Sequence, residues 1–323
     1  MTLPVDGPER LDEAEIQAAV ELVRRLQDAI VAAVEVRPEL LEHVIVCVAA
    51  EGHVLVEDLP GVGKTTLARA VARALDLQFA RVQCTADLLP ADVVGTNVFN
   101  RREERFEFRP GPIFANVVLV DEINRASPKT QSGLLECMQE RRVTVDVYSH
   151  ELARPFIVLA TQNPVEFEGT YPLPEAQVDR FMARVSLGYP TPAGEAEMLR
   201  AHESADRVED IEPIASAAEL LAVQDAARRV HAADPLRAYV VALLGRTRDD
   251  RRVELGASPR AGLMLLRAAK ARALMHGRDH ALPDDVQALA DVVLAHRLVL
   301  APEALEVTAS DVVADAVAAT PAL

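Results

Sequence analysis

Apolar runs and helical stretches alternate along the first 190 residues of the chain. Five short apolar runs predict strands at 53–57, 79–84, 117–121, 156–160 and 183–187. The third and fourth runs are almost wholly apolar, which is typical of strands buried on both faces of a parallel sheet. Helical patterns fall between the runs at 64–75, 128–140 and 174–181. This alternation predicts a doubly wound α/β domain with a parallel five-stranded sheet.

The pattern differs at both ends of this region. Residues 11–51 predict two helices that are broken near Pro38. Beyond residue 190 no convincing strand remains, and helices are expected at 192–204, 217–231, 235–248, 259–276 and 284–299. The sequence therefore predicts an α/β core with N-terminal helices over 1–190 and a small all-helical domain over 191–323.

Two segments do not fit the alternation of strands and helices. Residues 93–114 contain a charged turn between two short strands, and residues 143–155 contain a second hairpin pattern. Both are predicted to be insertions on the α/β core. Exposed loops on a rigid scaffold often contact partners, but a plain solvated turn is an equally good interpretation of either one.

The turn between the first strand and the next helix has the composition of a phosphate-binding loop. Gly61 and Gly63 allow positive φ angles, Lys64 can reach phosphates, and the hydroxyl of Thr65 can ligate Mg²⁺. One position departs from the pattern, because Asp58 stands where glycine is usual. A carboxylate is tolerated there if it points away from the phosphates or caps a backbone amide. The residues expected to contact nucleotide are Pro60, Gly61, Val62, Gly63, Lys64, Thr65 and Thr66.

Acidic and amide side chains follow the third and fourth strands. The third strand ends in Asp121 and Glu122, and Asn163 lies just beyond the fourth. The carboxyl ends of parallel strands face the ligand crevice in open α/β sheets. Asp121 is therefore a candidate Mg²⁺ ligand and Glu122 a candidate base for the attacking water. An ordinary acidic strand end and an Asn-Pro turn are the simpler alternatives.

Two arginines are candidates for contacts with the γ-phosphate. Arg180 ends the short helix before the fifth strand and could act on a neighbouring subunit, or pair with a nearby acid on the surface. Arg260 lies in the first turn of the helix that Ser258 and Pro259 open. A cation there is unfavourable unless an anion such as phosphate is bound.

The composition argues against several other classes of protein. The chain has 34 basic and 50 acidic residues, a net charge of −16, so it is a poor general nucleic-acid binder, although a basic loop is not excluded. Tryptophan is absent, which removes stacking platforms for single strands. No apolar run is long enough to span a membrane, and residues 1–15 lack the apolar core of a signal peptide. The three cysteines occupy apolar or helical contexts typical of a reducing, cytoplasmic compartment: Cys47, Cys84 and Cys137.

From about residue 20 to residue 300 the chain resembles the AAA+ ATPases, and within them the MoxR family. The most specific stretches are 111–126, 131–140, 160–164 and 168–177. The resemblance implies that Lys64 and Thr65 belong to Walker A, Asp121 and Glu122 to Walker B, and Asn163 to sensor 1. It implies that Arg180 is the arginine finger and Arg260 sensor 2. It also makes 93–114 the helix-2 insert and 143–155 the pre-sensor-1 hairpin, in which Asp146 stands near a turn where glycine is expected.

The resemblance further implies an ATP-hydrolysing, Mg²⁺-dependent chaperone that assembles as a hexameric ring. Family members often work with a protein that carries a von Willebrand factor A domain, and the pair remodels or activates a protein client, frequently during metal insertion. Two alternatives remain open from the sequence. One is a nucleic-acid motor of the helix-2-insert class, which the acidic charge disfavours. The other is a nucleotide-dependent scaffold that hydrolyses little ATP, which the presence of Glu122, Asn163 and Arg180 disfavours.

Overall fold

The computed structural model describes residues 10–58, 61–163, 169–189, 192, 194 and 207–322. It divides into two compact units. The α/β unit comprises Leu26–Val44 and Glu51–Ala217, and the helical unit comprises Met1–Arg25, Ile45–Ala50 and Ala218–Leu323. The domain boundary expected at residue 190 adjoins residues outside the described part and stays a prediction.

The α/β unit is built on the five-stranded sheet that the sequence predicts. Its strands lie in the order β2-β5-β8-β1-β9, and every neighbouring pair is parallel. The register places Gln83 opposite Asp121 and Glu57 opposite Gln162, so the carboxyl ends of four strands meet at one edge. The strand bounds are β1 Val54–Glu57, β2 Phe79–Gln83, β5 Val117–Asp121, β8 Ile157–Gln162 and β9 Ala183–Val185.

Local sequence explains the helices beside the sheet. Helix α3 (Lys64–Ala74) follows the glycine turn, and α5 (Pro128–Glu140) begins at Ser127, whose hydroxyl accepts a hydrogen bond from the backbone N–H of Thr130. Pro128 lacks a backbone N–H, but at the first helical position an N–H would have no partner within the helix, so nothing is lost. Helix α6 (Glu175–Val178) is shorter than the expected 174–181, because Arg180 and Phe181 donate to carbonyls three residues back in a tight terminal turn.

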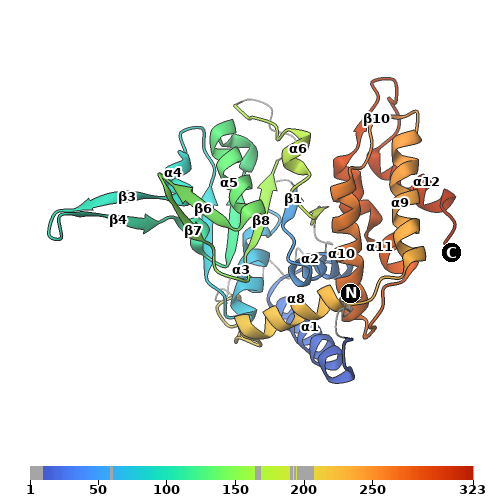
Figure 1. Ribbon diagram of the computed structural model, residues 1–323, viewed down its shortest axis with the longest axis horizontal. Coiled ribbons are helices and arrows are strands. Elements are labelled where there is room, and N and C mark those ends of the chain that lie inside the picture. The colour runs from blue at the N-terminus through green and yellow to red at the C-terminus, as the bar shows by residue number, and fades with distance from the viewer. Residues whose placement is uncertain are drawn as a thin grey trace, which may run out of the picture. The chain divides into compact units, whose positions relative to one another are not determined.

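Both predicted insertions are antiparallel hairpins. The longer hairpin joins β3 (Gly95–Asn100) to β4 (Arg105–Pro110) after the short helix α4 (Pro90–Val94), and it projects from the α/β unit (Figure 1). The shorter hairpin joins β6 (Arg142–Val145) to β7 (Tyr148–Glu151). Asp146 forms its turn without glycine at φ 55°, a conformation that aspartate tolerates. The side-chain amide of Asn97 donates to Asp146 Oδ2 at 2.7 Å and ties the two hairpins together.

The helical unit contains most of the remaining elements. Helices α1 (Glu13–Ala33) and α2 (Pro38–Ala49) each contribute residues to both units, with the predicted break before Pro38. The other helices are α8 Ala217–Arg229, α9 Asp234–Asp249, α10 Pro259–Met275, α11 Pro283–Leu294 and α12 Ala309–Ala319. The helix expected at 192–204 lies outside the described residues, apart from 192 and 194. No helix in the described part of the chain is long and apolar enough to cross a bilayer.

The expectation of a wholly helical second domain is wrong in one detail. Strands β10 (Val253–Leu255) and β11 (Val299–Leu300) form a small antiparallel ladder in the helical unit. The helix expected over 284–299 ends at Leu294, and a short 3₁₀ turn leads into β11. The buried side chain of Arg297 donates to the carbonyl of Val293. This carbonyl at the end of α11 therefore has a partner although the helix does not continue.

Candidate active site

The turn after β1 is shaped to hold phosphate. Gly61 and Gly63 have φ angles of 87° and 91°, which side chains other than glycine rarely adopt. Gly63 also precedes α3 and supplies no side-chain cap, so the first N–H groups of that helix receive no hydrogen bond from it. Such N–H groups, together with the helix dipole, favour an anion. The side chain of Lys64 turns back over the loop, where its Nζ donates to the carbonyl of Asp58 at 3.0 Å.

The carboxylate of Asp58 points away from this turn. It is 7% exposed and accepts hydrogen bonds from the hydroxyl of Ser186 at 3.1 Å, from the backbone N–H of Gly188 at 3.2 Å, and from the N–H of Leu187. These donors belong to the segment after β9, so Asp58 fixes the end of β1 to it. The departure from glycine at this position therefore caps backbone amides and places no negative charge among phosphates.

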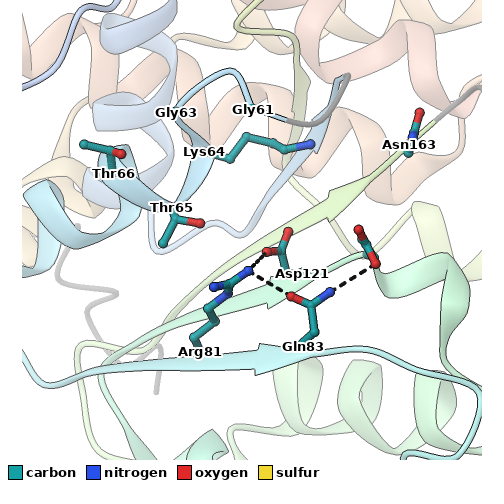
Figure 2. Close-up of a pocket in the computed structure, with 10 residues that line it drawn as sticks. Gly61, Gly63, Lys64, Thr65, Thr66, Arg81, Gln83, Asp121 and Asn163 are labelled. Atoms are coloured by element: carbon teal, nitrogen blue, oxygen red, sulfur yellow. Dashed lines mark hydrogen bonds and ion pairs between the residues drawn. The ribbon is translucent and has the colours of Figure 1, made fainter. Parts of the chain in front are cut away.

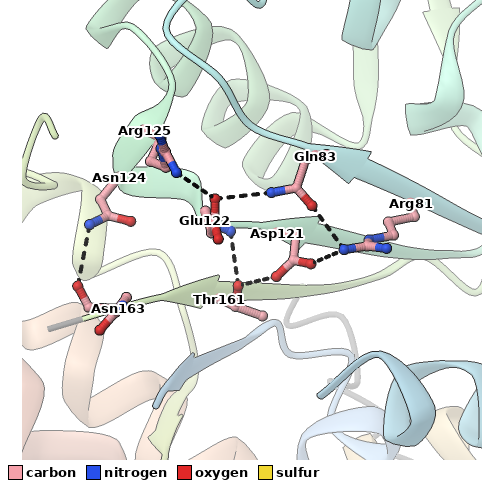
Figure 3. A network of polar contacts seen from close by, with 8 residues as sticks. All are labelled: Arg81, Gln83, Asp121, Glu122, Asn124, Arg125, Thr161 and Asn163. Carbon is pink, nitrogen blue, oxygen red and sulfur yellow. Dashed lines mark hydrogen bonds and ion pairs between the residues drawn. The ribbon is translucent and has the colours of Figure 1, made fainter. Parts of the chain in front are cut away.

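Asp121 and Glu122 are held by side chains from both neighbouring strands (Figure 3). Thr161 on β8 donates its hydroxyl to Asp121 Oδ1 at 2.6 Å and accepts from the backbone N–H of Glu122 at 2.9 Å. Glu122 has a positive φ of 56°, which turns the chain sharply after β5. Gln83 donates to Glu122 Oε2 at 3.0 Å. The two acids thus have different surroundings despite being adjacent in sequence.

A cavity of about 420 Å³ joins these elements (Figure 2). It brings together loop, helix and strand-end residues from separate parts of the α/β unit: Gly61, Gly63, Lys64, Thr65, Thr66, Arg81, Gln83, Asp121, Glu122 and Asn163. The Thr65 hydroxyl and Asp121 carboxylate supply hard oxygen ligands of the kind that Mg²⁺ prefers. Lys64 and the loop amides supply donors for phosphate, so the residues fit a metal–nucleotide complex.

Other predicted residues do not line this cavity. Val62 is buried, at 8% exposure, and is absent from the cavity lining. Pro60 lies outside the described residues. The Nε of Arg180 is buried and has no hydrogen-bond partner among the described residues. Arg260 lies in the first turn of α10 in the helical unit. The roles expected for these four residues stay predictions.

Two further residues that the sequence did not single out, Arg81 and Gln83, also line the cavity. Arg81 and Gln83 occupy alternate positions of β2, so both side chains project from the same face of the sheet beside Asp121. Two polar residues in a strand that otherwise resembled a core strand were the available signal. Their role depends on the pairing of β2 with β5. Residues 84–116 separate these two strands in the chain, so sequence spacing alone does not reveal the pairing.

The three cysteines are buried, as their apolar or helical contexts in the sequence indicated. Cys47, Cys84 and Cys137 are buried and form no disulfide. Burial, together with the negative charges of Asp121 and Glu122, raises the pKa of Cys84 to about 12. The thiol beside the acidic strand end therefore stays neutral and is a poor nucleophile.

Comparisons with known proteins agree with this geometry. Residues 53–183 match the model of the ATPase family associated with various cellular activities (AAA), and residues 245–316 match the AAA lid domain. The uncharacterised protein YeaC of Bacillus subtilis is 50% identical over 79% of this chain and 80% of its own length. The chaperone MoxR1 of Mycobacterium tuberculosis is 42% identical, covering 83% of this chain and 73% of its own. A solved structure of a presumed ATPase from Cytophaga hutchinsonii superposes with a TM-score of 0.90 at 35% identity, covering 96% and 98% of the two chains.

Proposed function

Because the chain belongs to the MoxR family of AAA+ ATPases, we propose that it hydrolyses Mg²⁺–ATP to ADP and phosphate and uses the energy to remodel or activate a protein client. One observation carries the proposal. A single cavity collects Lys64 and Thr65 from the loop after β1, Asp121 and Glu122 from the end of β5, and Asn163 from beyond β8. Phosphate donors, metal ligands and a candidate base therefore converge on one space.

Each of these side chains has a proposed role. Lys64 and the loop amides bind the phosphates, and Thr65 with Asp121 holds Mg²⁺, which neutralises charge developing on the phosphate oxygens. Glu122 orients the attacking water and accepts its proton. Asn163 contacts the γ-phosphate or that water from the neighbouring strand. Gln83, which donates to Glu122 at 3.0 Å, orients the base.

We further propose that the site is completed in an oligomer, with a hexameric ring as the expected assembly. Arg180 is absent from the lining of the cavity in its own chain, and its Nε has no partner among the described residues. An arginine placed to act in trans would stabilise charge in a neighbouring site. Arg260, at the start of α10, is proposed as the contribution of the lid.

The longer hairpin supports contact with a protein client. Its cross-strand pair Phe99 and Phe106 is 49% and 70% exposed, with ring centroids 5.3 Å apart. Towards the base on the same face, Phe108 stacks on His150 of the shorter hairpin at 3.9 Å. Exposed aromatic side chains on a rigid support are typical of contact surfaces for other proteins. The net charge of −16 disfavours a nucleic-acid track.

The partner proposed from the family is a cytoplasmic protein with a von Willebrand factor A domain, and metal-cofactor insertion is the proposed setting.

The test is a pull-down from native extract with Glu122→Gln, with and without ATP, because a variant that binds but does not hydrolyse ATP should retain its partners. We expect ATP-dependent recovery of such a partner or of a metalloenzyme precursor. The same experiment with Phe106→Ser added should lose the client. ATP-dependent recovery of nuclease-sensitive complexes would contradict the chaperone proposal and favour the nucleic-acid motor.

A further inference from the structure

Arg81 donates a hydrogen bond to Asp121, the carboxylate that is proposed as a Mg²⁺ ligand. Its Nη2 donates to Asp121 Oδ2 at 2.6 Å, while Thr161 donates to Oδ1 at 2.6 Å, so both oxygens of Asp121 already accept hydrogen bonds (Figure 3). The Asp121 side chain is 13% exposed and that of Arg81 is 49% exposed. The acid is therefore held from two sides and largely shielded from solvent, whereas about half of the arginine side chain is exposed to solvent.

This contact opposes the binding of a divalent cation. A cation bonded to Oδ2 would lie beside a guanidinium nitrogen, and like charges at such a distance repel strongly where solvent is partly excluded. The hydroxyl of Thr161 carries no charge and imposes no comparable penalty at Oδ1. Arg81 must therefore move before Asp121 can serve as a metal ligand without repulsion.

The cavity offers Arg81 an alternative partner. Arg81 lines the same space as Lys64 and Thr65 (Figure 2), and a guanidinium pairs well with phosphate oxygens. Its second acceptor, Gln83 Oε1 at 2.8 Å, belongs to the residue whose amide holds Glu122. When Arg81 moves, Asp121 Oδ2 and Gln83 Oε1 lose their hydrogen bonds from the guanidinium in the same step.

We propose that Arg81 is a positioning residue, an inference that rests on the proposed function. Arg81 pairs with Asp121 before ligands enter, and it moves to the phosphates when metal and nucleotide bind together. The exchange makes Arg81 the residue that sets how much Mg²⁺ the site requires. It also links metal loading to the side chain that orients Glu122.

The test is the free Mg²⁺ concentration that gives half-maximal tightening of nucleotide binding, measured with a fluorescent ATP analogue on the full chain. We expect Arg81→Gln to lower that concentration by about tenfold through loss of one like-charge repulsion. Arg81→Lys, which keeps the charge, should stay within about threefold of wild type on the same reasoning. Arg109→Gln, which removes an exposed arginine outside the cavity lining, is the control for net charge and should not shift it.

An unchanged half-saturating Mg²⁺ concentration in Arg81→Gln would overturn the inference, as would an equal shift in Arg81→Lys. If Arg81→Gln does not fold, as judged by thermal unfolding without nucleotide, Arg81→Met keeps the unbranched chain and takes its place with the same expectation. Failure of the proposed function looks different, because wild type and Lys64→Ala would then bind the analogue equally at every Mg²⁺ concentration.

Discussion

Replacing Glu122 with glutamine is expected to lower kcat for ATP hydrolysis by about 10²–10⁴-fold, the range usual for loss of a general base. The amide keeps the size of the carboxylate and one acceptor oxygen, so the contact from Gln83 is retained. It cannot accept a proton from water at neutral pH. Lys64, Thr65 and Asp121 are untouched, so nucleotide affinity should change little.

Steady-state phosphate release and equilibrium nucleotide binding measure the two effects separately. Glu136→Gln is a matched control, because Glu136 is an exposed glutamate on α5 that does not line the cavity. It should leave kcat unchanged. A Glu122→Gln enzyme with kcat close to that of the control would show that another group activates the water.

Replacing Asp285 with alanine is expected to destabilise the protein by about 3–5 kcal/mol, as breaking a buried ion pair does. The Asp285 side chain is fully buried and accepts from Arg272 at 2.8 Å and from Arg278 at 2.7 Å. It also caps α11 by accepting from the backbone N–H of Leu282 at 2.8 Å. Removing it leaves two guanidinium groups and a helix end without their shared acceptor.

Chemical denaturation measures this loss, with Asp284→Ala as the control. Asp284 is exposed in the same first turn, so its removal should cost less than about 1 kcal/mol. Equal losses from the two variants would show that the buried network is unimportant.

The pH dependence provides a second check on Asp285. Burial alone would raise the pKa of Asp285, but hydrogen bonds from Arg278, Leu282 and Arg272 outweigh it and lower the pKa below its ordinary value. A lowered folded-state pKa gives stability that is present above the unfolded value of about 3.9 and is lost as the pH falls through the folded pKa. Wild-type stability should therefore decrease in acid more steeply than that of Asp285→Ala.

The sequence predicted features that depend on local patterns. Hydrophobic runs located the five strands of the sheet, and the motif around Lys64 located the loop, because both signals lie within a few consecutive residues. The AAA+ fold and MoxR membership are likewise confirmed by the relatives and the solved structure. The reason why aspartate is tolerated at position 58 could not be predicted. Its partners Ser186, Leu187 and Gly188 follow β9, which pairs with β1 but lies far from it in the sequence.

Features that depend on strand order were not predicted. Arg81 and Gln83 gained meaning only when β2 was found beside β5, because their contacts with Asp121 and Glu122 cross between strands. The β10–β11 ladder was missed because each strand is only two or three residues long, too short to show a period of two. In both cases the sequence pattern of a short segment is ambiguous, and its role becomes clear only from the strand with which it pairs in the folded protein.

The most direct test of the central claim is equilibrium binding of Mg²⁺–ATP to the wild-type protein, Lys64→Ala and Lys129→Ala. Lys64 is the lysine of the cavity, while Lys129 is exposed at the start of α5 and does not line it. Loss of hydrogen bonds from a charged donor costs about 3 kcal/mol, so Lys64→Ala should bind roughly 100-fold more weakly than wild type. Lys129→Ala should bind as wild type does. Tight, unchanged binding by Lys64→Ala would contradict the assignment of this cavity as the nucleotide site.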